Sequence, residues 1–184
     1  MRRLGVAVAV LALALAGCGD KKKTVTFTDN EGQYLDLGGL RYQVQLSRQL
    51  NPYDVEDRAY LQGLPRSVSS LRAGESWFAV FLRVENPSSH PVPAATSFVL
   101  KDTQNNRFVP VPIASINPFA YEGGFVQAKD NLPPAQSVAQ LNESIGGAEI
   151  LFKVPVKSYA NRPLELTIRD PRDQTRTATV DLDV

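Results

Sequence analysis

The chain has 184 residues, of which 43% are hydrophobic and 21% charged, in the proportions of an ordinary globular protein. Its 20 basic and 19 acidic side chains nearly cancel, so charge gives no reason to expect a nucleic-acid partner. One Cys, one His and one Met are too few for a zinc, copper or haem site within the chain, and they exclude an internal disulfide. We therefore expect neither a metal nor another cofactor.

The N-terminus has the pattern of a signal peptide. Two arginines precede the apolar run 4–16, which is shorter than the roughly 20 residues of a membrane-spanning helix. The run ends at Leu15-Ala16-Gly17-Cys18, which resembles the lipobox of bacterial lipoproteins at every position. The resemblance implies that residues 1–17 are the signal peptide, that cleavage falls between Gly17 and Cys18, and that the Cys18 thiol receives a diacylglyceryl group. Two acyl chains suffice for stable anchoring, so we expect the protein on the extracytoplasmic side of a bacterial cell membrane.

Residues 18–33 are mostly polar and predict a flexible tether between the lipid and the folded domain. The tether begins with Gly19-Asp20-Lys21-Lys22-Lys23. These lysines either contact anionic head groups or belong to a solvated spacer, and the sequence leaves both interpretations open.

After the tether, apolar and polar residues alternate in short segments separated by turns, which is typical of strands with one buried face. The segments 40–46, 164–168 and 178–184 alternate most regularly. The segment 77–84 is apolar on both faces at its start, as expected of a central strand. About seven to nine strands predict a single all-β domain over residues 34–184, an immunoglobulin-like β-sandwich.

Two long stretches lack this alternation. Residues 51–76 exceed the roughly 12 to 15 residues usual for an irregular loop, so we expect a short helix within them. The signals are a cap at Asn51, Pro52 at the first helical position, the acidic Asp54, Glu56 and Asp57 near the positive end of the helix dipole, and Gly63 and Pro65 as stops. Residues 114–142 form a second, irregular crossing between strands.

Three segments together resemble a known family of proteins: the apolar strand and turn at 77–86, the predicted hairpin at 98–108, and the strand pair within 147–170. The chain from residue 40 onward resembles bacterial secreted lipoproteins of unknown function with an immunoglobulin-like sandwich, related in fold to a secreted immunogenic antigen of mycobacteria. The resemblance implies the fold and supplies no catalytic residue. The 51–76 insertion departs from the family pattern.

Few residues of this sequence point to catalysis. The sequence has no Gly-x-Ser-x-Gly elbow, no phosphate-binding loop and no dinucleotide fingerprint. His90, between Ser89 and Pro91, is typical of a surface turn residue rather than a general base. A carboxylate pair among the 19 acidic residues would suffice for glycosidase chemistry. The acidic cluster at 54–57 is more typical of a helix start than of a calcium loop, because it lacks the alternating ligands and central Gly.

The aromatic residues of the irregular crossing are the candidates for partner binding. Phe119, Tyr121 and Phe125 lie close to Gly123 and Gly124, and aromatic side chains supply much of the contact area in protein interfaces. They either bind a partner or plug one open end of the sandwich. Tyr53 and Tyr60 in the insertion carry the same ambiguity.

These patterns favour a membrane-anchored, extracytoplasmic lipoprotein that acts as a non-catalytic binding or interaction module of the cell envelope. Its expected partners are the membrane, through Cys18, and an envelope protein or polymer, through the aromatic residues. The alternatives are a carboxylate-based envelope hydrolase and a passive structural spacer.

Overall fold

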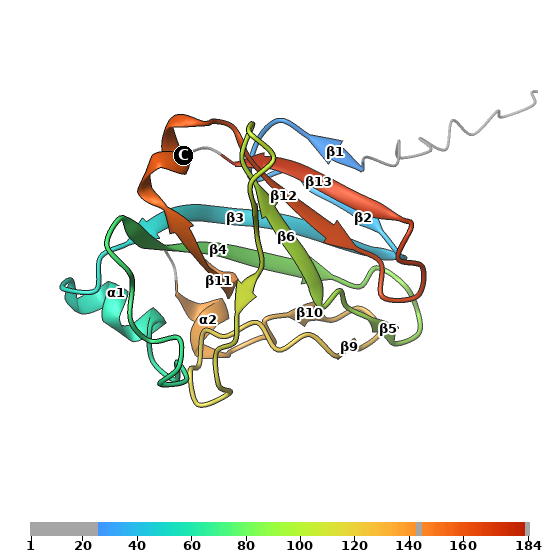
Figure 1. Cartoon of the computed structure of the whole chain (residues 1–184). Helices are drawn as coiled ribbons and strands as arrows, with labels where there is room; N and C mark the ends of the chain where they lie inside the picture. The colour runs from blue at the N-terminus through green and yellow to red at the C-terminus, as the bar shows by residue number, and fades with distance from the viewer. Residues whose placement is uncertain (1–25, 143–144, 183–184) are drawn as a thin grey trace, which may run out of the picture.

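The structure, a computed structural model, describes residues 26–142 and 145–182 (Figure 1). Seven of its strands have four or more residues, within the predicted number, and six further strands have two residues each. In chain order the elements are β1 (Phe27–Thr28), β2 (Tyr34–Leu37), β3 (Leu40–Leu50), α1 (Val55–Tyr60), β4 (Glu75–Glu85), β5 (Val92–Pro93), β6 (Ser97–Lys101), β7 (Arg107–Phe108), β8 (Pro110–Val111), β9 (Phe125–Val126), β10 (Asn131–Leu132), α2 (Val138–Leu141), β11 (Ala148–Pro155), the 3₁₀ helix η1 (Val156–Ala160), β12 (Leu164–Arg169) and β13 (Thr177–Leu182).

The strands form two stacked sheets, so the predicted β-sandwich is confirmed. Sheet 1 has the order β1-β13-β12-β6-β7, and sheet 2 has the order β2-β3-β4-β11-β8, with β10 also paired to β4. Strands β5 and β9 form a separate small ribbon. The main hydrophobic core lies between sheets 1 and 2 and includes side chains from β2, β3, β4, β6, β11, β12 and β13.

Strand β4 has an apolar sequence on both faces because each face packs into a hydrophobic cluster. Phe78, Val80 and Leu82 point into the main core. Trp77 and Phe81 point to the opposite face of sheet 2, where a second hydrophobic cluster lies. Because β4 is central, between β3 and β11, and covered on both faces, the expectation drawn from the segment 77–84 is confirmed.

The second cluster is closed by the two irregular stretches, which we call the cover layer (residues 51–76, 112–142 and 145). The cover layer contributes Tyr60 from α1 and Phe119 from the crossing, both packed on the outer face of sheet 2. Asn117 ties the two stretches together, since its buried amide donates to the backbone oxygens of Tyr60 (2.7 Å) and Gln62 (3.1 Å). Parts of both stretches therefore form a third layer on sheet 2, whereas Tyr121, Val126 and Leu132 of the second stretch pack on the main core.

The predicted helix of the insertion is present, but it begins later than expected. Its cap is Asp54, whose Oδ1 accepts hydrogen bonds from the backbone of Glu56 (2.9 Å) and Asp57 (3.2 Å). Asn51 is therefore wrong as the cap. Its side chain accepts from the Tyr53 backbone N–H (3.0 Å) and fixes the turn that leads into the helix. The helical residues end at Tyr60, before Gly63.

The folded domain includes residues that the sequence assigned to the tether. Strand β1 pairs in parallel with β13, Phe27 opposite Thr179 and Thr28 opposite Val180. The backbone N–H of Gly32 donates to Val44 O at 2.8 Å. The pairing with β13 and the backbone hydrogen bond to β3 thus hold the segment 27–33 against both sheets.

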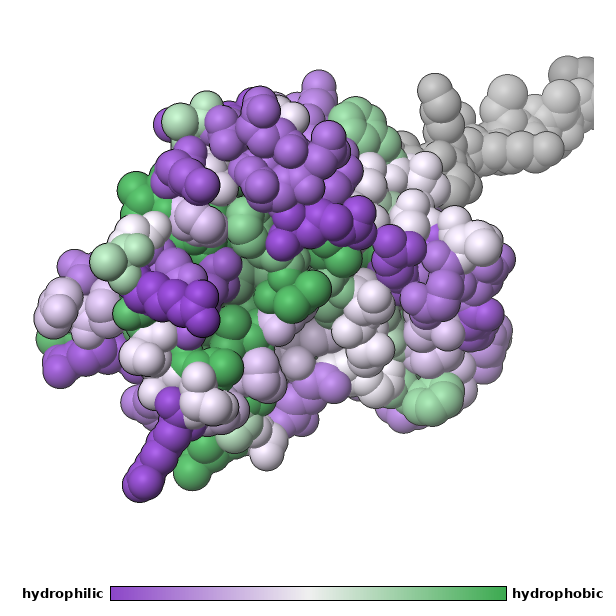
Figure 2. Space-filling model, viewed as in Figure 1, coloured by the Kyte–Doolittle hydropathy of each residue, from purple (hydrophilic) through white to green (hydrophobic). Residues whose placement is uncertain are grey.

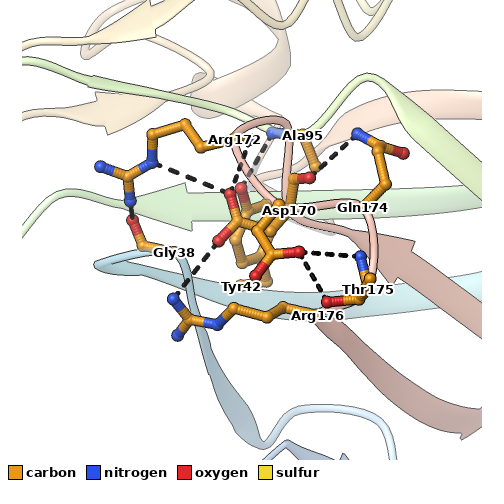
Figure 3. Close-up of polar contacts among 9 residues, drawn as sticks. Gly38, Tyr42, Ala95, Asp170, Arg172, Gln174, Thr175 and Arg176 are labelled. Carbon is orange, nitrogen blue, oxygen red and sulfur yellow. Dashed lines mark hydrogen bonds and ion pairs between the residues drawn. The ribbon is translucent and has the colours of Figure 1, made fainter.

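A polar cluster around Asp170 joins the β12–β13 turn to the β2–β3 turn (Figure 3). The buried Asp170 carboxylate accepts from the Arg172 backbone N–H (2.9 Å) and forms ion pairs with Arg172 (3.8 Å) and Arg176 (3.7 Å). The Arg172 guanidinium also donates to Gly38 O. Beside this cluster, Tyr42 accepts a hydrogen bond from the Ala95 N–H at 2.9 Å. These contacts hold the two sheets together at this end of the sandwich.

Gly38→Ala is expected to destabilise the protein through two separable effects. Gly38 has φ +61°, where a side chain costs about 1–2 kcal/mol, and an added Cβ would lie 2.9 Å from Asp170 Oδ2. Gly74→Ala is the matched control, because Gly74 has φ +80° with nothing within 4 Å of the added Cβ. Urea unfolding should show a larger loss for Gly38→Ala. Equal losses would mean that Asp170 moves aside without cost.

Candidate ligand-binding site

The lipobox residues Gly17 and Cys18 lie outside the described residues. Cleavage and lipidation at Cys18 therefore stay predictions from the sequence. Within residues 26–142 and 145–182, no helix is both long enough and apolar enough to cross a membrane.

The three aromatic residues of the crossing do not share one surface. Phe119 is half-buried and packs edge-on against Tyr60, with ring centroids 4.7 Å apart, in the second cluster. Tyr121 packs at 5.2 Å against Phe98 of the main core and donates its hydroxyl to Ala95 O at 2.8 Å. Phe125, in β9, is 67% exposed. Two of the three are thus held by internal packing, and only Phe125 presents a free ring.

Of the other aromatic and acidic candidates, Tyr53 is free at the surface and most of the rest are engaged within the fold. Tyr53 is exposed, whereas Tyr60, the last residue of α1, is buried in the second cluster. The Asp57 carboxylate binds the Arg48 guanidinium and the Asn51 backbone N–H, and Asp54 caps the helix. These acids therefore serve the helix start and its attachment to β3. No group of three or more potential metal ligands occurs in the described part of the chain.

His90 lies exposed in the turn after β4. Its backbone oxygen accepts hydrogen bonds from the Asn86 amide and the Ser88 hydroxyl, each at 2.8 Å. These contacts involve the backbone of His90, and they fix the turn.

A candidate that sequence reasoning missed is Glu149, at the start of β11. Side chains of β11 alternate, so that Ile150 and Phe152 enter the main core while Glu149 and Leu151 face the cover layer. Glu149 lies opposite Phe81 in the β11–β4 register. The residue is 1% exposed, and neither carboxyl oxygen has a hydrogen-bond partner among the described residues.

The crossing covers Glu149 by pairing with its backbone. The Glu149 N–H donates to Phe119 O (2.6 Å), and Glu149 O accepts from the Tyr121 N–H (2.9 Å). Residues 119–121 thereby continue the sheet edge beyond β8, which pairs with β11 only at Leu151 and Phe152. The burial of this carboxyl is consequently a result of tertiary pairing with a distant segment.

Burial raises the pKa of the Glu149 carboxyl well above its usual value. The positive charge of Arg48 acts against this shift, and the negative charge of Asp57 adds to it. Because removal from water penalises the charged form more than Arg48 favours it, the neutral acid is the preferred form of Glu149 over a wide pH range.

Glu149 lines a cavity of about 270 Å³ at the edge of β11. Its apolar walls include Phe98, Val111, Ile113 and Tyr121, and Glu122 is its second acidic residue. Figure 2 shows apolar residues gathered in a hollow between the lower half of β6 and β8, the yellow-green strand that descends beside it in Figure 1. Hydrophilic residues surround them. No Lys, Arg or His is among the described residues that line this cavity.

A second hollow, of about 380 Å³, lies within the cover layer between β9, β10 and α2. The exposed Phe125 lines it, together with Leu132, Pro133 and Ala139. This hollow puts the one free aromatic ring of the crossing beside further apolar surface.

The geometry of the first cavity suits binding better than acid–base catalysis. A general acid must come within hydrogen-bond distance of its substrate. Both Glu149 oxygens are out of reach of solvent, so a substrate in the cavity does not touch them in this conformation. What the arrangement offers is an apolar, acidic hollow with a buried polar group that lacks a partner.

Comparison with known proteins adds information on the fold. No protein-family model matches the chain, and no curated protein matches it significantly. Among solved structures, the yjhA protein of Bacillus subtilis is similar with a TM-score of 0.56 and 12% identity, over 85% of this chain and 100% of that one. This likeness shows the fold alone.

Two other solved structures are more distant. An uncharacterized β-sandwich protein of Clostridium difficile 630 has a TM-score of 0.46 and 11% identity, over 88% of this chain and 99% of that one. The ycdA protein of Bacillus subtilis, described as a candidate lipoprotein, has a TM-score of 0.44 and 10% identity, over 82% of this chain and 38% of that one.

Proposed function

We propose that this protein is a lipid-anchored, extracytoplasmic binding module of the bacterial cell envelope. In this proposal Cys18 carries the diacylglyceryl anchor, and the cover layer contacts an envelope partner without catalysis. The lipobox at Leu15-Ala16-Gly17-Cys18 supports the anchor. The distribution of exposed apolar side chains supports the binding role.

That distribution is the observation that carries the proposal. Of the ten large hydrophobic side chains exposed in the described chain, six belong to the cover layer, and exposed apolar side chains, aromatic ones above all, supply contact area in protein interfaces. The six are Tyr53, Val55, Ile116, Phe125, Val138 and Leu141. Strand β1, the first element after the anchor, lies at the upper right of Figure 1, whereas α1, α2 and β9 lie along the lower side. The cover layer thus lies on the side of the domain away from β1.

A carboxylate-based hydrolase is the second candidate. One observation favours it, because Glu122 and Glu149 line the same cavity and burial raises the pKa of Glu149. Glycosidases act through a pair of carboxyl groups. The enclosed oxygens of Glu149 count against it. A hydrolase would lose activity in Glu149→Gln, whereas partner binding through Phe125 would be unaffected.

The test compares two exposed phenylalanines in the full chain, purified from native envelopes with its lipid. We expect Phe125→Ala to lose a cross-linked envelope partner that the unmodified protein retains. Phe27→Ala is the matched control, because Phe27 is 53% exposed in β1, on sheet 1. Phe119 and Tyr121 are unsuitable for this test, since their loss would damage internal packing.

The anchor is read out in the same preparations. Mass spectrometry of the mature chain should find a diacylglyceryl-modified Cys18 at the N-terminus, and Cys18→Ser should remove the lipid. An unmodified Cys18 would refute the anchor. Equal partner recovery by Phe125→Ala and Phe27→Ala would refute the cover layer as the binding surface.

A further inference from the structure

We propose that the cavity beside β11 binds a small organic ammonium ion, with Glu149 as its counter-ion and Phe98 and Tyr121 as aromatic walls. This inference rests on the proposed binding function and names a ligand class for it.

The first argument is the missing partner of Glu149. Nearly all buried side-chain polar atoms in proteins have a hydrogen-bond partner, and each exception calls for an explanation. Both Glu149 oxygens are buried, and neither is bonded within the described chain. An ammonium group has three hydrogen-bond donors and a positive charge. Its donors would bond the Glu149 oxygens, and its charge would keep the carboxylate ionised.

The second argument is the charge of the cavity walls. Glu122 and Glu149 are acidic, and the described lining residues include no basic side chain. The nearest cation known to act on Glu149 is Arg48, whose guanidinium is bonded to Asp57. An anionic ligand would find no basic side chain to pair with here, whereas a cation would be attracted by Glu122 and would pair with Glu149 once that carboxyl ionises.

The third argument is the aromatic wall. Phe98 and Tyr121 pack edge to face, with centroids 5.2 Å apart, and both line the cavity. Aromatic faces attract organic cations. The Tyr121 hydroxyl already donates to Ala95 O, so it does not serve as a donor for a carboxylate or phosphate ligand. The wall therefore favours a cation with an apolar body.

The size of the cavity limits the ligand. A volume of about 270 Å³ is slightly below the range of drug-sized pockets, which begins at about 300 Å³. At about 30 Å³ for each water-sized group, the cavity holds roughly nine such groups. A ligand of the size of benzylammonium fits this limit.

Binding requires the Glu149 side chain to turn toward the ligand, since its oxygens now lie below the cavity wall. This rotation breaks no hydrogen bond, because the carboxyl makes none among the described residues. In the empty cavity burial favours the neutral acid, so binding of an ammonium ion releases one proton from Glu149. The other groups that face this carboxyl electrostatically are Arg48 and Asp57, which are paired with each other, and Glu122 at the cavity wall.

The test is calorimetry on the full lipidated chain in detergent. The probes are benzylammonium, the neutral benzyl alcohol and the anionic benzoate, which share a ring and differ in charge. We expect saturable binding of benzylammonium, and at least about tenfold weaker binding of the other two, as for the loss of a charged hydrogen bond. Affinity should rise with pH while Glu149 of the ligand-free protein is protonated, level off once that carboxyl ionises, and fall when benzylammonium itself loses its proton. Heats in buffers of different ionisation enthalpy should show one proton released per ligand.

Glu149→Gln keeps the shape of the side chain and removes its charge. It should weaken benzylammonium binding by about tenfold or more and abolish the proton release. Glu56→Gln is the control with the same change of charge, at an exposed position of α1 outside this cavity. Circular dichroism verifies the fold of both variants.

Several results would overturn the inference: equal binding of benzyl alcohol and benzylammonium, unchanged affinity in Glu149→Gln, or no binding of any probe. Phe125-dependent capture of a partner in the same preparations would then leave the proposed binding function standing, with a different ligand. Loss of that capture together with intact benzylammonium binding would refute only the cover-layer interface.

Discussion

Phe81→Ala is expected to lower the free energy of unfolding by about 3–5 kcal/mol, the range for truncating a buried Phe. Phe81 is fully buried on the outer face of β4. Its ring meets the Tyr60 ring edge to face, with centroids 4.9 Å apart. The lost side chain would leave a cavity between sheet 2 and the cover layer, where the pairing of β11 with β4 holds the backbone of Glu149 and the Asn142 amide donates to the Tyr60 hydroxyl at 2.8 Å.

Urea unfolding followed by fluorescence measures this loss directly at the affected cluster. Trp77 is the only Trp of the chain, and it lies in the same cluster as Phe81. Phe125→Ala is the matched control, because an exposed Phe away from buried contacts should change stability by no more than about 0.5 kcal/mol. A loss for Phe81→Ala as small as the control would mean that the cover layer contributes little to folding.

Comparing the unfolding transitions reported by two spectroscopic probes tests whether the cover layer folds together with the sandwich. If it does, fluorescence of Trp77 and far-UV circular dichroism should report one transition in the unmodified protein. Separate transitions would show that the cover layer opens before the sheets. A layer that opens independently would also expose the apolar second cluster, and this would change the surface available to a partner.

The parts of the fold that were predictable are those governed by local alternation. The segments 77–84 and 164–168 lie in β4 and β12, and the segment 178–184 lies in β13 as far as Leu182, because alternation in the sequence indicates the buried face of each strand. Strands of two residues, such as β5, β9 and β10, carry too few residues for a period to be visible. They form only where a distant segment supplies partners, as Val84 and Glu85 do for β10.

The helix start was predictable only to within a few residues. Asn51 and Asp54 both have side chains that cap helices, and the sequence does not decide between them. The structure decides through Asp57, whose carboxylate is held by Arg48 of β3 and by the Asn51 backbone N–H. With its own N–H used in that way, Asn51 forms the preceding turn.

The candidate site was not predictable, because the residues next to Glu149 in the sequence do not indicate that its side chain is buried. A charged residue near the start of an apolar strand is typical of an exposed strand end. Lys153, later in the same strand, does reach the surface, where its ammonium group lies near the Trp77 ring and donates to Ser70 O. Glu149 differs only because residues 119–121 pair with its backbone and cover it. That pairing joins segments almost thirty residues apart and leaves no periodic pattern.

Glu149→Leu is expected to raise the free energy of unfolding by about 1–3 kcal/mol, the cost of a buried polar group without a partner. Leu has a similar length and suits the apolar neighbours Phe81 and Leu151. A residue kept at the expense of stability is typical of a functional site. The same variant should therefore lose benzylammonium binding while it gains stability.

The pH dependence of this gain identifies its cause. Below about pH 4.3, the usual pKa of Glu, the carboxyl is protonated in both the folded and the unfolded chain, and the gain from Leu is constant. Above that pH the unfolded chain loses the proton, while the raised pKa of buried Glu149 keeps it on the folded chain. The unmodified protein therefore loses up to about 1.4 kcal/mol of stability per pH unit until the folded carboxyl also ionises, so the advantage of Glu149→Leu should grow over that range.

Glu149→Gln separates charge from polarity. It should remove the pH-dependent part of the difference, because Gln does not ionise, and keep the cost of a buried polar side chain without a partner. Unfolding in urea at a series of pH values measures all three proteins. An advantage of Glu149→Leu that stays constant with pH would show that Glu149 titrates equally in both states, which contradicts its burial beneath residues 119–121 and with it the cavity wall on which the ammonium site depends.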